Sequence, residues 1–193
     1  MLLSIKSIDF AYSPKKEVIK DVSFDLKDGD ELCISGANGK GKTTLLRLIL
    51  GILTPTAGTI EKNLNSNELF YIPASDRALY LRLRAGSMLK FLLAPYECCN
   101  SRHIADFYAD NFGHLDFNKK CGELSNGQRR KLFLAAAMMI KPKLILFDEI
   151  FTALDKESLS LFLDAVTKSN SALVYTSTQY EKISINSRSF ELL

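Results

Sequence analysis

A glycine-rich segment near the amino end has residue types and spacing suited to binding phosphate groups. It reads Gly36-Ala-Asn-Gly-Lys-Gly-Lys42-Thr43 and fits the pattern G-x-x-x-x-G-K-[ST] in full. Glycines let backbone N–H groups turn inward around an anion, and the positive end of a following helix adds to the attraction. We expect Lys42 to reach the β- and γ-phosphates of a nucleotide and the Thr43 hydroxyl to bind Mg²⁺. The residues expected to contact the nucleotide here are Gly36, Ala37, Asn38, Gly39, Lys40, Gly41, Lys42, Thr43 and Thr44.

An acidic pair supplies the second half of such a site. The apolar run at residues 144–147 ends in Asp148-Glu149, which places the pair at the carboxyl end of a buried parallel strand, beside the phosphate loop. There Asp148 is expected to hold Mg²⁺ through water, as the partner of Thr43. Glu149 is expected to polarise the attacking water as general base, so Glu149 and Lys42 are the predicted catalytic residues.

A third segment, Leu124-Ser125-Asn126-Gly127-Gln128, comes before a strongly helical stretch and has two compatible interpretations. Ser125, with Gln128 three residues later, is a capping box for that helix. The free N–H groups of a helix start, together with a serine hydroxyl, also make a phosphate site. Both interpretations can hold at once.

In this order, and with Ala153-Leu154-Asp155 after them, these segments resemble the ATP-binding subunit of an ABC transporter. The resemblance spans residues 1 to about 178. The usual signature of the family is Leu-Ser-Gly-Gly-Gln, so Asn126 departs from it, although asparagine accepts left-handed backbone angles better than most residues. The resemblance implies ATP and Mg²⁺ as cofactors and ATP hydrolysis that drives transport by nucleotide-dependent closure of a dimer.

The resemblance also implies a head-to-tail dimer in which two ATP molecules lie between the chains. The signature residues of one subunit would then face the γ-phosphate held by Lys42 of the other; they are Ser125, Asn126, Gly127 and Gln128. Asp155 matches the loop through which the two subunits touch. Tyr12 matches the aromatic residue that stacks on adenine, with an ordinary surface tyrosine as the alternative. Homodimer and heterodimer both remain open.

Two residues that the family uses for hydrolysis are replaced in this chain. The family's glutamine, which reaches Mg²⁺ and the attacking water, is Ala74 here, and its histidine, which holds the γ-phosphate, is Ser177. Asp76 and Gln179 lie close by in the sequence and are candidate substitutes. We expect normal ATP binding and slow hydrolysis, because losing one positioned group commonly lowers the rate ~10²–10³-fold. The alternative is an ABC-type ATP-binding switch, or a degenerate half of a heterodimer, with weak or no hydrolysis.

Hydrophobic periodicity predicts the elements that position these residues. Alternation at Val22, Phe24 and Leu26 predicts a strand antiparallel to one at residues 2–10. Further strands are expected at 31–35, 69–72, 143–148 and 172–176, and helices at 43–53, from 125 to about 141, and around 159–166. This alternation predicts an α/β fold: a P-loop NTPase core with a mostly parallel sheet, an N-terminal antiparallel β subdomain and a small helical insertion. We expect one ATP-binding domain over residues 1–193, with the insertion at about 74–141.

Composition excludes several classes of protein. With 47% hydrophobic and 24% charged residues, the chain is neither disordered nor collagen-like, and it is no disulfide scaffold. The net charge of +3 is too small to indicate nucleic-acid binding. The longest apolar run, residues 132–140, is far shorter than the ~20 residues that span a bilayer, and the amino end lacks the features of a signal peptide.

The resemblance therefore implies a cytoplasmic protein that lies peripherally on the inner face of the cell membrane and binds transmembrane subunits. In the family, the zone at residues 77–84 builds the groove that receives a cytoplasmic helix of the membrane subunit. The alternating apolar and basic residues of this stretch fit a groove with a basic rim, and they fit an ordinary edge strand or loop equally well.

Overall fold

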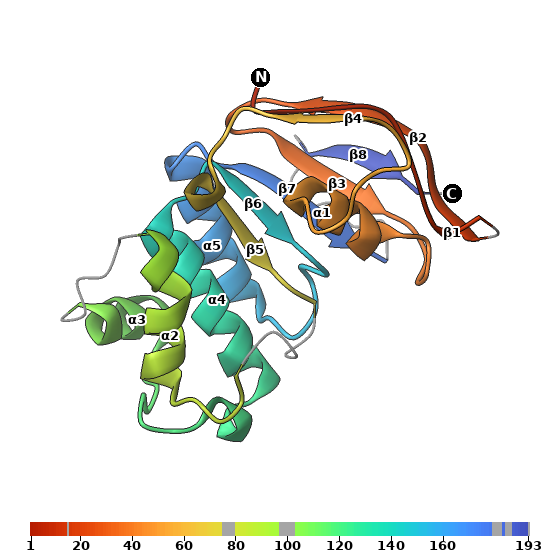
Figure 1. The fold of residues 1–193 in the computed structure, drawn as a ribbon. Coiled ribbons are helices and arrows are strands. Elements are labelled where there is room, and N and C mark those ends of the chain that lie inside the picture. The colour runs from red at the N-terminus through yellow and green to blue at the C-terminus, as the bar shows by residue number, and fades with distance from the viewer. Residues whose placement is uncertain (15, 75–79, 97–102, 179–182, 184–186, 193) are drawn as a thin grey trace.

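Two β-sheets and a layer of helices make up the chain (Figure 1). The computed structural model describes all residues except 15, 75–79, 97–102, 179–182, 184–186 and 193. The smaller sheet is antiparallel, and the strands of the larger sheet pair in parallel. The α/β fold expected from the sequence is therefore confirmed, including the antiparallel β part at the amino end.

The antiparallel sheet contains β1 (Leu3–Ser13), β2 (Lys16–Leu26) and β4 (Ala57–Lys62) in the order β2-β1-β4. Leu3 lies opposite Leu26, which confirms the antiparallel pair expected from the alternation. The sequence does not predict β4, because Ile60 alone among its residues is half-buried and the others are exposed. Gly58 lets β4 approach β1, since its φ is 78° and a Cβ there would lie 2.3 Å from the Ser7 carbonyl oxygen.

The parallel sheet has the order β5 (Leu69–Ile72), β6 (Leu144–Phe147), β7 (Ala172–Ser177), β3 (Glu31–Ser35) and β8 (Arg188–Glu191). Every residue of β6 and β7 is buried, as their continuous apolar runs predict. Because β7 lies between β6 and β3, the carboxyl ends of these three strands meet at one edge of the sheet. That edge carries Asp148, Ser177 and the glycine-rich loop.

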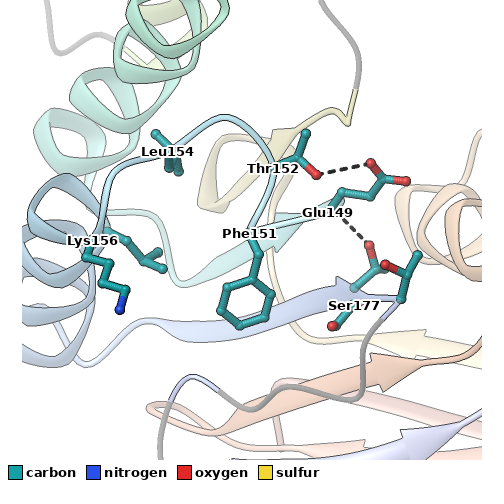
Figure 2. A pocket seen from close by; sticks show the side chains of 9 residues that line it. Glu149, Phe151, Thr152, Leu154, Lys156 and Ser177 are labelled. Carbon is teal, nitrogen blue, oxygen red and sulfur yellow. Dashed lines mark hydrogen bonds between the residues drawn. The ribbon is translucent and has the colours of Figure 1, made fainter.

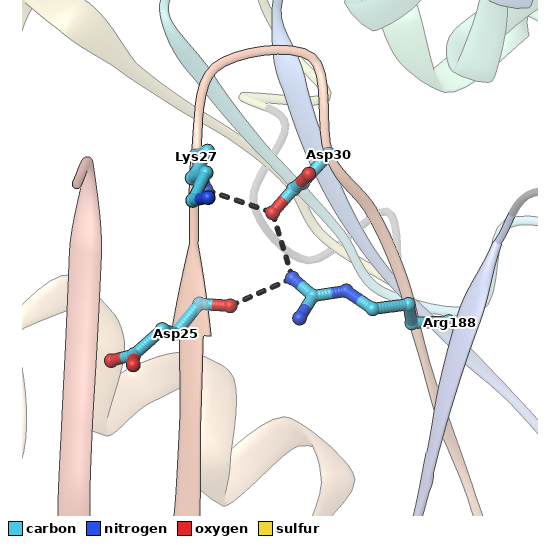
Figure 3. A network of polar contacts seen from close by, with 4 residues as sticks. All are labelled: Asp25, Lys27, Asp30 and Arg188. Atoms are coloured by element: carbon cyan, nitrogen blue, oxygen red, sulfur yellow. Dashed lines mark hydrogen bonds and ion pairs between the residues drawn. The ribbon is translucent and has the colours of Figure 1, made fainter.

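Strand β8 was not expected from the sequence, since three of its four residues are exposed. Polar contacts hold it in place (Figure 3). Arg188 Nη2 donates to the carbonyl oxygen of Asp25 and to Asp30 Oδ2, both at 2.7 Å, and Asp30 Oδ2 also accepts the Lys27 N–H. These bonds tie β8 to the turn between β2 and β3.

Helix α1 (Lys42–Leu50) lies between the two sheets (Figure 1). It is shorter than the helix at 43–53 that the sequence predicts from the positions of Pro55 and Gly58. Gly51 ends it instead: this residue has a left-handed φ of 80°, and its N–H bonds back to the carbonyl of Leu48 at 3.0 Å.

Four helices pack on the face of the parallel sheet opposite to α1, where their buried side chains form a hydrophobic core with those of the strands. They are α2 (Ala85–Leu93), α3 (Ile104–Phe112), α4 (Asn126–Ile140) and α5 (Lys156–Lys168), with short 3-10 turns at Ser66–Glu68, Ala94–Tyr96 and Cys121–Glu123. Residues 80–84, the described part of the stretch 77–84, form turns and one isolated bridge from Arg84 to Lys120, and so are no regular edge strand. Within the described residues, none of the helices combines the length and the apolar character needed to cross a bilayer.

Candidate nucleotide site

The glycine-rich loop connects β3 to α1 and folds around the side chain of Lys42. The Lys42 ammonium donates to the carbonyl oxygens of Gly36 at 2.6 Å and Ala37 at 3.0 Å, and the residue is only 6% exposed. Gly41 has a φ of 93°, and a Cβ there would lie 2.8 Å from Val18 Cγ1, so a side chain at this position would clash with β2. The loop therefore holds a buried cation at the start of a helix, where an anion is favoured.

A hollow of about 250 Å³ opens beside this loop. It brings together residues from β1, β2, the loop, α1 and the acidic pair, namely Tyr12, Lys16, Val18, Asn38, Gly39, Gly41, Lys42, Thr43, Thr44 and Glu149. The predicted nucleotide contacts Gly36, Ala37 and Lys40 belong to the same loop but do not line the hollow. Most of the predicted site residues of the glycine-rich loop thus share one cavity with Glu149.

Thr43 and Asp148 meet directly, although they are far apart in the sequence. Thr43 Oγ1 donates to Asp148 Oδ2 at 2.7 Å, and Thr176 Oγ1 donates to Asp148 Oδ1, also at 2.7 Å. Asp148 is 1% exposed. Burial, and then the charge of Asp148, raise the pKa of Tyr71 to about 12, so this tyrosine stays neutral beside the carboxylate. A hydroxyl and a carboxylate held this close are hard oxygen donors, which fit a Mg²⁺ ion.

Glu149 follows β6 directly, and two threonines bond to its N–H and to its carboxylate. Its N–H donates to Thr176 Oγ1 at 2.7 Å, and its Oε2 accepts from the Thr152 hydroxyl at 3.3 Å (Figure 2). Its φ is 54°, in the left-handed region that residues other than glycine rarely adopt. In this conformation Glu149 lines the hollow at the phosphate loop.

A second hollow, of about 340 Å³, lies on the other side of Glu149 (Figure 2). Its lining comes from the segment after β6, the start of α5 and the end of β7, namely Glu149, Phe151, Thr152, Leu154, Lys156, Leu159, Thr176, Ser177 and Thr178. Ser177 ends β7 and is buried there, with a short side chain at the edge of open space. Ala74 follows β5 and Pro73. Asp76 and Gln179, the candidate substitutes, lie outside the described residues.

Tyr12 stands at the mouth of the phosphate-loop hollow. Its hydroxyl lies 3.1 Å from Thr44 Oγ1, and its ring packs edge-to-face on Phe10 with the centroids 4.9 Å apart. The residue remains 50% exposed. One part of the ring is therefore fixed against the protein while the rest is open to a ligand.

The signature segment caps α4, as one of its two interpretations predicts. Ser125 Oγ accepts the Gln128 N–H at 3.1 Å, and Gln128 Oε1 accepts the Ser125 N–H at 3.0 Å, which confirms the capping box. Ser125 and Asn126 are exposed, and no residue of 125–128 lines the hollow at the phosphate loop. Figure 1 shows the amino end of α4 at the far end of the helical layer from α1. One chain therefore does not bring together the two segments that the sequence predicts to bind phosphate.

The segment at 152–155 packs against the signature helix within the chain. A Cβ on Gly127 would lie 3.2 Å from the Ala153 carbonyl oxygen. Asp155 caps α5 by accepting the Ser158 N–H at 2.8 Å, and Lys131 pairs with it, also at 2.8 Å. The bond from Lys131, and then those from Ser158, hold the pKa of Asp155 below its usual value.

Sequence reasoning missed two residues of the site. Thr176 joins Asp148 to the backbone of Glu149, and the signal for it was a hydroxyl at the end of an apolar strand next to Ser177. Arg130 is buried under the acidic pair, but it is one of three consecutive basic residues, and nothing in the sequence distinguishes it from the other two. The local sequence does not indicate the hydrogen-bond partners of these two residues, because the partners lie on other segments of the chain.

Comparisons with known proteins agree with this geometry. The model of the ABC transporter family matches residues 19–152, well over half of the chain. The cytochrome c biogenesis ATP-binding export protein CcmA of Pseudomonas savastanoi pv. phaseolicola is 37% identical over 153 residues, 74% of this chain and 71% of that protein. The energy-coupling factor transporter ATP-binding protein EcfA1 of Mycoplasmoides gallisepticum is 32% identical over 168 residues, 80% of this chain and 60% of that protein.

YxlF of Bacillus subtilis, an uncharacterized ABC transporter ATP-binding protein, is 34% identical over 163 residues, 80% of this chain and 54% of that protein. The chain thus spans little more than half the length of EcfA1 and YxlF. Among solved structures, a Pyrococcus furiosus protein assigned to the ABC transporter ATP-binding proteins has a TM-score of 0.81 at 26% identity, over 98% of this chain and 96% of that chain. CbiO1 of Clostridium perfringens, part of the ABC transporter complex cbiONQ, shares the fold with a TM-score of 0.71 at 20% identity, over 92% of this chain and 78% of that chain.

Proposed function

The chain belongs to the ABC transporter family of ATP-binding proteins, and from that premise we propose that it binds and hydrolyses ATP to power transport by a separate membrane protein. The observation that carries the proposal is the 2.7 Å bond between Thr43 and Asp148. It joins the phosphate loop to the acidic strand, with Glu149 on the rim of the same hollow. In this proposal the chain is one nucleotide-binding domain, and residues 74–141 are its helical insertion.

In this proposal, different residues of the hollow bind the phosphates, hold the metal ion and accept the proton. Lys42 and the loop N–H groups bind the β- and γ-phosphates, and Tyr12 stacks on the adenine. Thr43 and Asp148 hold Mg²⁺, which when bound neutralises charge that develops on the phosphate oxygens. Glu149 accepts a proton from the attacking water, and the bond from Thr152 orients its carboxylate.

We further propose that two ATP-binding chains close around the nucleotide head to tail. The support is the separation of the signature segment from the phosphate loop within one chain, with an exposed Ser125 hydroxyl at the free end of α4. A second chain would supply Ser125, Asn126, Gly127 and Gln128 to the γ-phosphate. Asp155 lies in the segment that packs on this signature and would take part in the same contact.

The proposed membrane partner would dock where apolar side chains are exposed on α2 and on the segment before it. Tyr80, Leu81 and Phe91 are exposed, and the rings of Tyr80 and Phe91 pack edge-to-face with their centroids 5.2 Å apart. Arg82 and Arg84 add positive charge beside them. Such a surface fits an amphipathic helix of a transmembrane subunit on the cytoplasmic side of the membrane, with an acidic residue facing the two arginines.

A second candidate function is an ATP-binding switch with little hydrolysis. Ala74 and Ser177 favour it, because neither side chain can position water or hold the γ-phosphate as a glutamine or a histidine does. Glu149 supports hydrolysis, and we therefore propose a slow ATPase with normal nucleotide binding.

Replacement of Thr43 by valine tests the observation that carries the proposal. Thr43→Val keeps the shape of the side chain and removes the oxygen, whereas Thr43→Ser keeps the oxygen and is the matched control. Calorimetric titration with ATP, with and without Mg²⁺, should show that the gain in affinity from Mg²⁺ is lost in the valine variant and kept in the serine variant. Equal gains in both variants would overturn the assignment of the metal site.

A further inference from the structure

Arg130 is a charged residue inside the core. It lies on α4, shortly after the signature segment, and is only 3% exposed. A guanidinium group without partners would be costly to bury. The structure instead surrounds it with carbonyl oxygens and with the ring of Phe147, whose centroid lies 5.1 Å from the guanidinium carbon.

The hydrogen bonds of Arg130 go to the main chain of two segments that are far apart in the sequence. Nη1 donates to the Pro73 carbonyl, directly before Ala74. Nη2 donates to the carbonyls of Asp148 at 3.1 Å and Glu149 at 2.8 Å. Nε donates to the Thr152 carbonyl at 3.4 Å. A single planar group thus joins the end of β5, the acidic pair and the segment after it.

The bond to the Glu149 carbonyl bears on the catalytic carboxylate. Glu149 has a φ of 54°, a conformation that persists only where surrounding contacts enforce it. Its N–H is held by Thr176 and its carbonyl by Arg130, so the peptide groups on both sides of its Cα are fixed. The same peptide also has two backbone bonds, from the Thr152 N–H to the Glu149 carbonyl at 3.1 Å and from the Ile150 N–H to the Thr176 carbonyl at 3.4 Å. Without Arg130, the Glu149 carbonyl keeps only the bond from Thr152, and we expect the peptide to shift enough to turn the carboxylate away from the phosphate loop.

We propose that Arg130 is a positioning residue for ATP hydrolysis, which holds the backbone of Glu149 so that its carboxylate faces the nucleotide. This proposal rests on the ATPase function proposed above. Nucleotide binding does not depend on Arg130, because this residue does not line the hollow at the phosphate loop and the Asp148 side chain is held by Thr43 and Thr176.

The test compares Arg130 with its neighbour on the same helix. Arg130→Met removes every donor, and Arg130→Gln keeps an amide that reaches at most two carbonyls. Arg129→Met is the matched control, since Arg129 donates to the Leu124 carbonyl at 2.9 Å on the signature side. Single-turnover hydrolysis by the full chain should fall ~10–100-fold in Arg130→Met, and less in Arg130→Gln, with the Kd for Mg-ATP changed less than ~2-fold. The Arg129 variant should match the wild type in both.

Hydrogen exchange of the amides at residues 149–153 gives a readout that is independent of activity. These amides should exchange faster in Arg130→Met than in the wild type or in Arg129→Met, with thermal unfolding confirming a folded chain. Equal exchange and equal turnover in Arg130→Met and the wild type would overturn the positioning role. Failure of the wild type to bind Mg-ATP would instead overturn the proposed function. If the wild type binds ATP without measurable turnover, the exchange comparison decides.

Discussion

Two neighbouring parts of the sheet edge differ in how many of the side chains expected for ATP binding and hydrolysis they contain. In the phosphate-loop edge (Lys42, Thr43 and Asp148), every side chain is held by a hydrogen bond of 3.0 Å or less, and Asp148 is fully buried. In the hydrolysis flank (Ala74, Glu149 and Ser177), two positions carry small side chains, and a hollow of about 340 Å³ opens beside Glu149 and Ser177. We therefore predict that binding and turnover depend on different side chains and can be changed separately.

The largest effect is expected at the phosphate-loop edge. Lys42→Ala removes the buried cation that we propose to pair with two phosphates, and charged hydrogen bonds of ~1.5–3 kcal/mol each imply a loss of Mg-ATP affinity of at least ~100-fold. Lys20→Ala, on the exposed side of β2, is the control and should bind as the wild type does. Calorimetry measures both. An unchanged affinity in Lys42→Ala would contradict the prediction that the phosphate-loop edge binds ATP.

Glu149 should show the opposite behaviour, with binding kept and turnover lost. Glu149→Gln cannot accept the proton of the attacking water, so the hydrolysis rate should fall ~10²–10⁴-fold while an ATP-bound dimer accumulates. Glu157→Gln, in the first turn of α5, removes an exposed carboxylate of the same kind and is the control. Light scattering should show monomers without nucleotide and dimers of Glu149→Gln with Mg-ATP. Monomers alone at saturating Mg-ATP would contradict a homodimer and indicate a different ABC chain as partner.

The two substituted positions of the hydrolysis flank should respond to repair. Ala74→Gln combined with Ser177→His restores a group for water and a group for the γ-phosphate, and both act mainly in the transition state. We expect kcat to rise at least ~10-fold, below the ~10²–10³-fold of a complete catalytic group, because the surrounding side chains are not arranged to support them. The Kd for ATP should stay the same. If the wild type turns over as fast as the double variant, Asp76 and Gln179 are the next residues to replace.

The smallest effect concerns the ion pair next to the signature. Asp155→Asn keeps the cap on α5 but loses the charge that pairs with Lys131. Asp155 is half exposed, so the pair should contribute at most ~1 kcal/mol, or a fall of ~2–4 °C in Tm. The pKa of Asp155 is lowered by folding, so this stability is present above its unfolded pKa and is lost as pH falls through the folded one. The difference in Tm should therefore be full at neutral pH and shrink in acid; a difference that grows in acid would contradict the pairing.

The sequence predicts the buried elements of the fold better than the exposed ones. β6 and β7 are buried at all positions, and each contains a run of apolar residues, which is the pattern that predicts a buried parallel strand. β4 and β8 lie at sheet edges with few buried side chains, and no local pattern marks them. β8 depends on contacts of Arg188 with residues near the amino end, which only the folded chain brings together.

The site shows the same division. The meeting of Thr43 with Asp148 follows from two local patterns, because carboxyl ends of parallel strands share one edge of the sheet. The local sequence around Thr176 and Arg130 does not indicate their partners. Their hydroxyl and guanidinium act on groups supplied by other segments, so only the strand order and the packing of α4 reveal them.

The rate at which bound ATP is cleaved tests the difference between the phosphate-loop edge and the hydrolysis flank most directly. The wild-type chain is mixed with radiolabelled Mg-ATP, captured on a filter, and the bound nucleotide is identified over time. A typical turnover of ~10 per second, lowered ~10²–10³-fold by the substituted flank, gives ~0.01–0.1 per second. The account predicts that ATP is captured and that most of it is still uncleaved after several seconds. Bound nucleotide that is already ADP within the first second, or no captured nucleotide at all, would contradict it.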